Sequence, residues 1–370
     1  MRVLFVTGIF PPDLGGPARY VPAIAGELQA RGHDIVTVVT LSDRLDHDDG
    51  VYSFPVLRLP RATSRPLRVL RTTWTIWRNA IGADVAYLNG LVMEGIVAAK
   101  LIARRRTVIK VVGDLIWERA RNARATALDL DGFQAARLPI RWRFLRWLQG
   151  WYTARADLVI VPSEYLGSIV RGWGVDAGKI RVIPNAVPLP PAADATPPAF
   201  DLVTVARLVP WKGIGALIEI AAANRWSLRI VGDGPLLAEL QRTAAASGGN
   251  ISFAGQVSPE RVCAEIRSAR IFVLNSSYEG LPHIVLEAKA AGVPVIAAAA
   301  SGTREVMHHD VDGLLVPVGD NPALVAAIRH LLTNDADRAR LRDAGCRQIE
   351  TEYRYAALAD ATEMALGGAR

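Results

Sequence analysis

Cysteine is scarce in this chain, which has two among its 370 residues, Cys263 and Cys346. Two cysteines cannot build the disulfide framework of a small secreted domain, and their positions show no metal-ligand spacing. We therefore expect the chain to function in a reducing compartment such as the cytoplasm.

Long apolar stretches are absent as well. No uninterrupted run reaches the roughly 18 apolar residues that a membrane-spanning helix needs. The opening MRVLFVTGIFPPDLGG has too short an apolar part to span a bilayer and lacks the small residues of a signal-peptide cleavage site. We interpret it as a buried first strand. Short repeats and low-complexity tracts are also missing, which argues against repeat architectures.

Positive charge is plentiful, but only in one half of the chain. The net charge is +7. Residues 1–197 contain 26 Lys and Arg against 17 Asp and Glu, whereas residues 198–370 contain 17 against 19. The basic half suggests a phosphate-rich partner or an anionic membrane surface, and an Arg-rich composition without function is the alternative. No nucleic-acid-binding motif accompanies the charge, so we expect no nucleic-acid partner.

The chain is too long for a single core and alternates short apolar runs with amphipathic helical stretches, which predicts parallel sheets covered by helices. The fold class is therefore α/β, with two doubly wound, Rossmann-like domains. The predicted strands are 3–7, 34–40, 84–89, 107–112, 157–162 and 180–184 in the first domain, and 201–206, 228–232, 251–255, 271–275, 293–297 and 313–317 in the second.

The domain boundaries follow from these strands and from one stretch rich in Pro and Ala. We predict an N-terminal domain at 1–185, a linker at 186–199, a C-terminal domain at 200–350 and a final helix at 351–370 that packs back across the junction. Open α/β sheets bind ligands beyond the carboxyl ends of their strands, so the expected site is a cleft between the two domains.

Several loops after strands have the composition of phosphate-binding elements. Gly15 and Gly16 precede a helix that begins near Pro17, although a plain surface turn would look the same. Arg207 and Lys212 are two cations five residues apart, which suits a diphosphate.

A second glycine turn follows a strand at Gly232 and Gly234. Helix capping is the alternative for each of these phosphate-facing pieces taken singly.

Two carboxylates, Glu279 and Glu287, stand eight residues apart in NSSYEGLPHIVLEAKAAGVPVIA. The first precedes a Gly-Leu-Pro turn and the second lies within the following helix. They could form a general acid and base pair, hold two parts of one ligand, or cap the helix.

These stretches together resemble the retaining, nucleotide-sugar-dependent glycosyltransferases of the family 4 type, which have the GT-B fold. The resemblance covers nearly the whole chain. It rests on GIFPPDLGG, VPSEYL, VIPN, VARLVPWKG, VGDGP, FAGQV and, most specifically, YEGLPHIVLEAKAAGVPVIA.

The resemblance implies a role for each candidate residue. Glu279 would contact hydroxyls of the donor sugar, and Glu287 would hold the ribose hydroxyls of the nucleotide. Arg207 and Lys212 would neutralise the leaving diphosphate. The remaining donor-binding residues implied are Gly15, Gly16, Gly232, Gly234, Val257, Gly280, Leu281, Pro282, His283 and Ile284.

The implied reaction needs no cofactor and no metal beyond the nucleotide-diphosphate sugar itself. Cations and helix N-termini would stabilise the leaving oxygen, and the acceptor would attack from the face that the phosphate leaves. The pattern departs from the family at Asp114, which stands where many relatives have a histidine. Asp114 would either bind the donor sugar or acceptor as a catalytic residue, or merely cap the next turn.

Four Asp-x-Asp triplets begin at Asp46, Asp129, Asp310 and Asp335, but none lies at the phosphate-facing elements, so we attribute them to chance.

The segments 58–80 and 136–155 mix arginine with tryptophan, which suits either an anionic bilayer or a core with a wet face. The acceptor is expected to be a glycan, with a lipid-linked glycan at the cytoplasmic membrane face as the favoured case. A sugar-nucleotide epimerase of the same fold and a non-catalytic nucleotide-binding partner are the alternative functions.

Overall fold

The computed structural model describes residues 1–13, 15–190 and 197–367. The chain divides into two compact units, a first unit of Met1–Ile183 with Leu358–Arg370 and a second unit of Pro184–Ala357. Part of the predicted linker (191–196) and the last residues of the predicted final helix (368–370) lie outside the described residues. Within the described ranges, no helix is long and apolar enough to cross a membrane.

The first unit is built on a seven-stranded parallel sheet of order β3-β2-β1-β4-β5-β6-β7. Its chain runs outward from β1 in one direction to β3 and in the other to β7, which is the doubly wound arrangement. The strands are β1 (Arg2–Thr7), β2 (Asp34–Ser42), β3 (Val56–Pro60), β4 (Val85–Asn89), β5 (Arg106–Lys110), β6 (Leu158–Val161) and β7 (Ile180–Val182).

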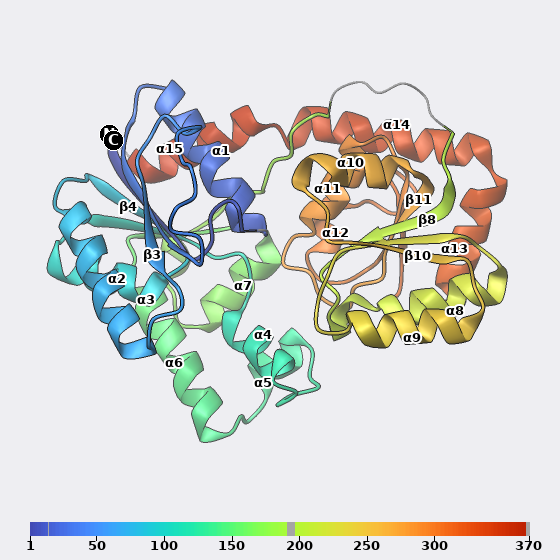
Figure 1. Ribbon diagram of the computed structural model, residues 1–370, viewed down its shortest axis with the longest axis horizontal. Helices are drawn as coiled ribbons and strands as arrows, with labels where there is room; N and C mark the ends of the chain where they lie inside the picture. The colour runs from blue at the N-terminus through green and yellow to red at the C-terminus, as the bar shows by residue number, and fades with distance from the viewer. Residues whose placement is uncertain (14, 191–196, 368–370) are drawn as a thin grey trace. The chain divides into compact units, whose positions relative to one another are not determined.

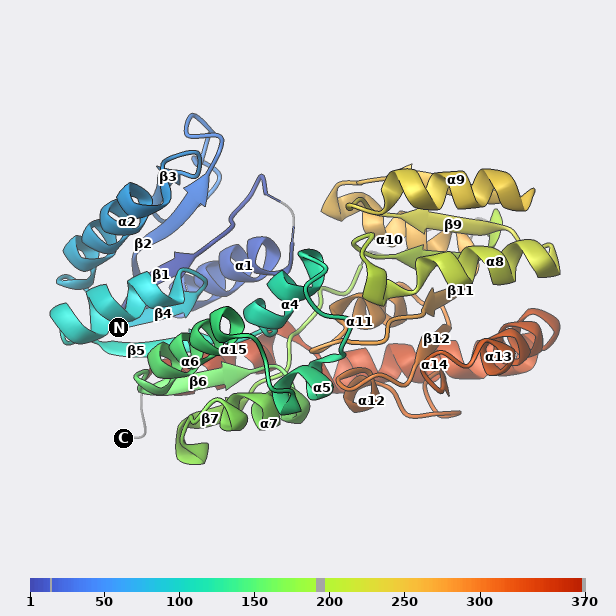
Figure 2. The same cartoon turned by 90° about the horizontal axis from the view of Figure 1, so that it is seen from below.

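Helices cover both faces of this sheet (Figures 1 and 2). α2, α3 and α6 lie on one side, and α1 lies on the other with α15. The helices are α1 (Gly16–Ala30), α2 (Arg65–Ala80), α3 (Val92–Gly95), the π-helix η1 (Ile96–Ile102), α4 (Leu115–Asn122), α5 (Leu130–Ala135), α6 (Ile140–Ala154), α7 (Glu164–Gly172), the short 3-10 turn η2 (Ala177–Lys179) and α15 (Tyr355–Gly367).

The second unit has a six-stranded parallel sheet of order β10-β9-β8-β11-β12-β13. All six strands predicted for this half are present. They are β8 (Phe200–Val205), β9 (Leu228–Val231), β10 (Ile251–Gly255), β11 (Ala269–Leu274), β12 (Val295–Ala298) and β13 (Leu314–Val316).

Two apolar clusters show how this second sheet is buried. Ile271 and Val273 of β11 pack with α8, α9 and α13, whereas Phe272 and Leu274 pack with α10, α11 and α14. Successive side chains of a strand point to opposite faces, so a strand that is apolar throughout needs helices on both faces. The helical elements are η3 (Pro210–Lys212), α8 (Ile214–Asn224), α9 (Leu237–Ser247), α10 (Pro259–Arg267), α11 (His283–Ala290), α12 (Thr303–Val306), α13 (Asn321–Thr333) and α14 (Asp335–Glu352).

The last helix packs on the first unit. Glu363 of α15 accepts from Arg31 at 3.1 Å and lies 2.8 Å from the ring of His33, and Arg106 donates to the carbonyls of Ala365 and Leu366. The predicted final helix is two helices in the structure, because α14 ends at Glu352 and α15 begins at Tyr355. The α/β class and both doubly wound sheets are confirmed.

Candidate functional site

The second unit brings most of the predicted donor-binding residues to one edge of its sheet. The strand order reverses between β8 and β11, since β9 and β10 lie on one side of this pair and β12 and β13 on the other. Arg207 and Lys212 follow β8, and Glu279 follows β11. Such a switch point, at the carboxyl ends of the strands, is where doubly wound sheets bind ligands.

Lys212 and Glu279 meet at this switch point. The Lys212 ammonium donates to a Glu279 carboxylate oxygen at 2.5 Å, and the two side chains are 16% and 11% exposed. The pair is sheltered enough for its charges to interact more strongly than a surface pair, yet both groups still reach solvent. It is therefore a cation and a carboxylate that a ligand can contact together.

Backbone hydrogen bonds hold the two loops that carry this pair. Ser277 N donates to the Trp211 carbonyl at 2.8 Å, and the Asn275 side chain donates to the Gly213 carbonyl at 3.1 Å. Because the neighbours of Lys212 and Glu279 are joined in this way, the pair is positioned by the backbone and does not depend on two flexible side chains finding each other.

Arg207 is exposed, and the glycine turn after β9 supports its loop. Leu208 N donates to the Asp233 carbonyl at 2.9 Å. A Cβ on Gly232 would lie 2.0 Å from the Ala206 carbonyl oxygen, and one on Gly234 would lie 2.5 Å from the Leu208 carbonyl oxygen. These two glycines therefore allow the close approach that places Arg207, and their contact with the donor stays a prediction.

Helix α11 carries the second carboxylate of the Glu-x7-Glu element. Glu287 lies 3.0 Å from His283 Nδ1, one helical turn earlier, and His283 Nε2 donates to the Ala186 carbonyl at 3.0 Å. Both ring nitrogens of His283 thus face oxygen acceptors. The His283 ring therefore lies between Glu287 and the Ala186 carbonyl, a contact that sequence reasoning did not assign to its side chain.

The loop before α11 contains the other predicted cradle residues. Gly280 and Leu281 lie in the loop, Pro282 is the N-cap, and His283 and Ile284 form the first turn. The first turn of a helix has N–H groups without partners inside the helix, and it bears partial positive charge. Its position next to Glu279 suits a phosphate group.

Sequence reasoning missed Gly302, which follows β12. Its N–H donates to the Glu279 carbonyl at 3.0 Å, and a Cβ there would lie 2.1 Å from the Gly280 carbonyl oxygen. No side chain fits between this residue and the Glu279 loop. The sequence signal that could have identified Gly302 is a glycine shortly after a strand, in the segment ASGTREV.

The structure corrects the predicted catalytic role of Asp114. It is fully buried at the N-cap of α4, where Oδ1 accepts from the N–H groups of Ile116 and Trp117, and Oδ2 accepts from Gln134 at 2.7 Å. Burial raises its pKa, and the four donors around it oppose that shift. Both oxygens are occupied by the chain and shielded from solvent, so the capping role is the one that the structure supports.

The remaining predicted residues take simpler positions. Gly15 is the N-cap of α1 and Gly16 its first residue, which places both beyond the carboxyl end of β1 in the first unit. Val257 is half-buried after β10 and packs against the core of the second unit.

The Asp-x-Asp triplets have structural partners. Asp312 pairs with the buried Lys289 at 2.9 Å, Asp310 pairs with Arg340, and Asp129 caps α5. Among the described residues, no three His, Cys, Asp or Glu side chains are grouped as metal ligands.

Comparison with known proteins agrees with this geometry. The family model of the glycosyl transferase 4-like domain matches residues 15–186, and that of glycosyl transferases group 1 matches residues 195–348.

Two relatives and one solved structure illustrate the likeness. A lipopolysaccharide core biosynthesis glycosyltransferase of Rhizobium meliloti is 34% identical over 220 residues, which are 57% of this chain and 64% of that protein, so the match spans less than two thirds of it. A GDP-mannose-dependent α-(1-6)-phosphatidylinositol monomannoside mannosyltransferase of Mycobacterium tuberculosis is 27% identical over 389 residues, covering 97% of this chain and 96% of that one. The structure of Anabaena HepE with UDP and glucose shares the fold, with a TM-score of 0.80 at 19% identity over 100% of both chains.

Two doubly wound domains, the second with a sheltered cation and carboxylate at its switch point, give the chain the GT-B fold. The family matches identify the family within this fold. The chain belongs to the group 1 glycosyl transferases of the family 4 type, and it is a glycosyltransferase.

Proposed function

We propose that this chain is a retaining, metal-independent hexosyltransferase that moves a sugar from a nucleotide-diphosphate sugar to a lipid-linked glycan at the cytoplasmic face of the cell membrane. The observation that carries the donor part is the Lys212–Glu279 pair at the β8/β11 switch point, beside the first turn of α11. That arrangement offers a cation and N–H donors to the diphosphate and a carboxylate to sugar hydroxyls.

The nucleotide end of the donor is assigned to Glu287. A carboxylate accepts hydrogen bonds from both hydroxyls of a ribose, and the His283 ring lies beside it. Val257, after the edge strand β10, is assigned to the base.

The proposed transfer breaks the bond from the anomeric carbon to the phosphate oxygen and leaves the electron pair on the diphosphate. Arg207, Lys212 and the first turn of α11 stabilise that growing charge. The acceptor hydroxyl oxygen bonds to the anomeric carbon on the face that the phosphate leaves, and its proton passes to a leaving-phosphate oxygen. The configuration at the anomeric carbon is therefore retained.

The lipid-linked acceptor is supported by two observations. Basic residues outnumber acidic ones in the first 197 residues but not in the remainder. The mycobacterial relative, matched over nearly its whole length, has a phosphatidylinositol monomannoside in its name. An anionic surface would attract the basic half, with each Lys or Arg near it contributing on the order of 1 kcal/mol.

The test begins with a panel of nucleotide sugars, scored by thermal shift and by slow hydrolysis. With the donor identified, proton NMR of the released or transferred sugar reads the anomer before mutarotation. Retention in the presence of EDTA is the expected result. An inverted anomer, or activity lost in EDTA and restored by Mg²⁺ or Mn²⁺, would refute the corresponding part of the proposal.

The epimerase alternative is separated in the same assay. An epimerase converts the nucleotide sugar to its epimer when no acceptor is present, whereas a transferase releases free sugar and nucleoside diphosphate slowly. A chain that binds the nucleotide but catalyses neither reaction with any donor and acceptor would instead be a non-catalytic binding partner.

A further inference from the structure

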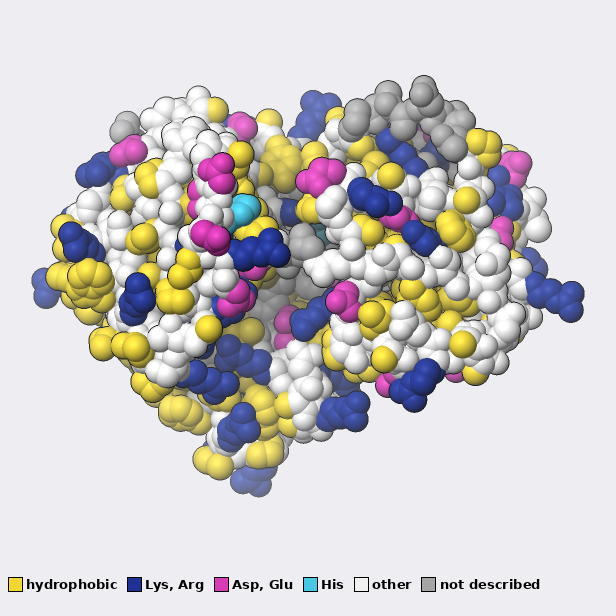
Figure 3. All heavy atoms as spheres, viewed as in Figure 1, with side chains coloured by type: hydrophobic (Ala, Val, Ile, Leu, Met, Phe, Trp, Pro, Cys, Tyr) yellow, Lys and Arg dark blue, Asp and Glu magenta, His cyan; other side chains and the backbone are white. Residues whose placement is uncertain are grey.

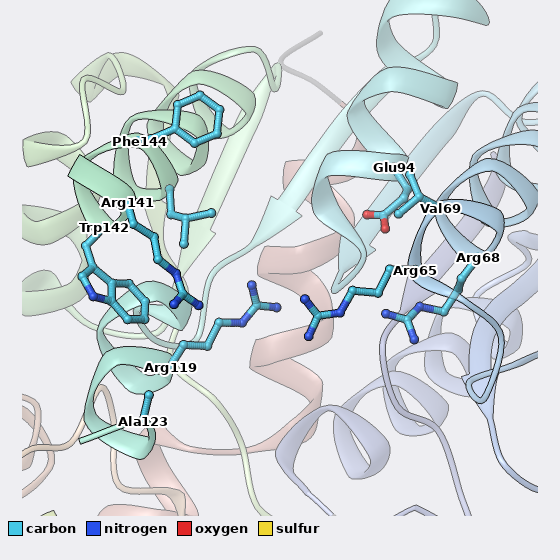
Figure 4. A pocket seen from close by; sticks show the side chains of 10 residues that line it. Arg65, Arg68, Val69, Glu94, Arg119, Ala123, Arg141, Trp142 and Phe144 are labelled. Carbon is cyan, nitrogen blue, oxygen red and sulfur yellow. The ribbon is translucent and has the colours of Figure 1, made fainter. Parts of the chain in front are cut away.

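The first unit contains an arginine-lined cavity that the donor chemistry does not use. It has a volume of about 710 Å³, and its lining includes four arginines and one acidic residue. Figure 4 shows Arg65 and Arg119 extending toward each other across it, with Arg68 and Arg141 beside them. We call it the arginine cavity, after its four arginines Arg65, Arg68, Arg119 and Arg141.

The cavity lies at the ligand-binding edge of the first sheet. Arg65 and Arg68 are on α2, which follows β3; Glu94 is on α3, which follows β4; and Arg119 is on α4, which follows β5. Three walls of the cavity therefore come from segments that start at the carboxyl ends of parallel strands, where sheets of this type bind ligands. The N-terminal part of α6 supplies the fourth wall, with Arg141 and Trp142.

The charge in the cavity is not balanced by the protein. Within the part of the chain that the structure describes, none of the four guanidinium groups forms an ion pair; Arg68 donates to the Arg61 carbonyl, and Arg141 lies 4.9 Å from the Trp142 ring centre. Glu94 supplies one negative charge against four positive ones. Guanidinium groups gathered in this way bind the oxygens of phosphate in bidentate fashion.

The two helices that open at the cavity add to this positive field. Neither α2 nor α6 has an acidic residue in its first turn or a side-chain hydrogen bond at its N-cap, and each has an arginine there instead. A cation at a helix N-terminus is unfavourable, because the helix dipole is positive at that end. An anion in the cavity would relieve this repulsion.

Exposed apolar side chains lie on the same two helices, and on α2 they are on the face opposite to Arg65 and Val69, which line the cavity. Leu67, Leu70 and Trp74 follow one face of α2 and are 55%, 68% and 51% exposed. Large apolar groups at such spacing in solvent indicate a binding surface.

Helix α6 carries a matching stripe. Ile140, Phe144 and Trp147 are 76%, 56% and 59% exposed, and the rings of Phe144 and Trp147 stack at 5.8 Å. Figure 3 shows basic and hydrophobic side chains side by side over the α4 and α6 end of the first unit. Part of the tryptophan-rich segment therefore packs inward, as Trp142 does, while the rest faces solvent.

We propose that the arginine cavity binds the phosphate or diphosphate of a lipid-borne acceptor, that the apolar stripe of α6, whose Phe144 lines the cavity, contacts its hydrocarbon chain, and that the stripe of α2 contacts the surrounding bilayer. This inference rests on the proposed function, because it names the group by which a lipid-linked acceptor is held. Four guanidinium groups match two phosphates, and the apolar stripe of α6 beside them matches the lipid that a soluble phosphate lacks.

The test measures binding of three probes by calorimetry: farnesyl diphosphate, inorganic pyrophosphate and farnesol. The cavity variant replaces Arg65 and Arg141 with Gln. Its matched control replaces Arg71 and Arg143 with Gln, which removes the same charge. Both arginines are also exposed and lie on the same two helices, but they do not line the cavity. Diphosphate that binds at the donor site contributes equally to the parent chain, the cavity variant and the control, so only a difference between these proteins is assigned to the cavity.

We expect farnesyl diphosphate to bind more tightly than either fragment, and the cavity variant to weaken it about tenfold or more, because charge-assisted hydrogen bonds are lost. The control should change it by about twofold or less. Equal weakening by both variants would reduce the effect to general charge and overturn the cavity assignment, as would a failure of farnesyl diphosphate to bind. Pyrophosphate binding as tightly as farnesyl diphosphate would overturn the lipid assignment.

Nucleotide-sugar binding by thermal shift, measured on the same two variants, reports whether they are folded and separates the two hypotheses. A cavity that binds farnesyl diphosphate in a chain that transfers no sugar would refute the proposed function alone. A chain that transfers sugar, with acceptor KM unchanged in the cavity variant, would refute this inference alone.

Discussion

Lys212 donates to Glu279 in the structure, so a bound diphosphate has to share that ammonium with a carboxylate. Removing Lys212 alone would leave a sheltered carboxylate without its cation, which confuses loss of function with loss of stability. Arg207 is the better test of charge stabilisation, because it is exposed and has no ion pair among the described residues.

Arg207→Ala should lower kcat about 10²-fold, since leaving-group charge grows in the transition state, with a smaller effect on donor KM. Glu287→Gln should do the reverse and mainly raise donor KM, because ribose contacts are the same in ground and transition states. Initial rates at varied donor concentration distinguish the two patterns. Full turnover by the Arg207 variant at saturating donor would contradict its assignment.

Lys110 is a residue whose charge should appear in the pH dependence of stability. It is buried at the end of β5, with its ammonium 4.4 Å from the Tyr20 ring centre and 3.5 Å from the Ile183 carbonyl oxygen. Burial lowers its pKa from the usual 10.5 to about 7. Between these two values the unfolded chain binds more protons than the folded one, so stability should rise with pH.

Lys110→Met should remove that rise and increase stability most below pH 7, where Lys110 is protonated in the folded chain as well. The slope attributable to one group is at most about 1.4 kcal/mol per pH unit. Urea unfolding of both proteins from pH 6 to 10 measures it. Parallel stability curves for the two proteins would show that Lys110 does not titrate in this range.

Among the elements, the loop between β11 and α11 depends on a residue outside it. Gly302→Ala should push the Gly280 carbonyl away and move Glu279, lowering kcat/KM about 10²-fold with a modest loss of stability. Gly215→Ala is the control, because a Cβ on Gly215 in α8 would lie no closer than 3.9 Å to a neighbouring side chain, and alanine favours a helix. Equal activity in both variants would show that the loop tolerates displacement.

The elements that the sequence predicts best are the buried strands. All twelve predicted strands are present. Nine of them lie inside a covered sheet and are rich in apolar residues, and the other three, β7, β10 and β13, are edge strands. The strand β3 was missed. It is an edge strand with Arg58 at its centre and Pro60 at its end, and such strands lack the apolar run of a central one.

The site was predictable only in part, because its residues are far apart along the chain. Lys212 and Glu279 are 67 residues apart, and only the resemblance to a family suggested that they belong to one ligand. The capping role of Asp114, the ring contacts of His283 and the close approach at Gly302 depend on neighbours brought by the fold. Spacing alone does not identify those neighbours.

At the scale of the whole molecule, the last helix stabilises the unit that contains the first strand. Leu358 and Leu366 of α15 are buried, and replacing both with Ala should cost about 2–5 kcal/mol each if the sites do not collapse. Hydrogen exchange with mass spectrometry should show lost protection in β1, β4 and β5 but not in β8 to β13. Equal loss in both units would indicate that they unfold as one.

The first unit is discontinuous in sequence, since residues 1–183 are completed by 358–370 and the second unit is inserted between them. This order has a consequence for synthesis on the ribosome. At about 5–20 residues per second, roughly 10–35 s pass between the end of the first segment and the appearance of α15. During that interval the second unit can fold while the first waits, with the surface that α15 will cover still open to chaperones.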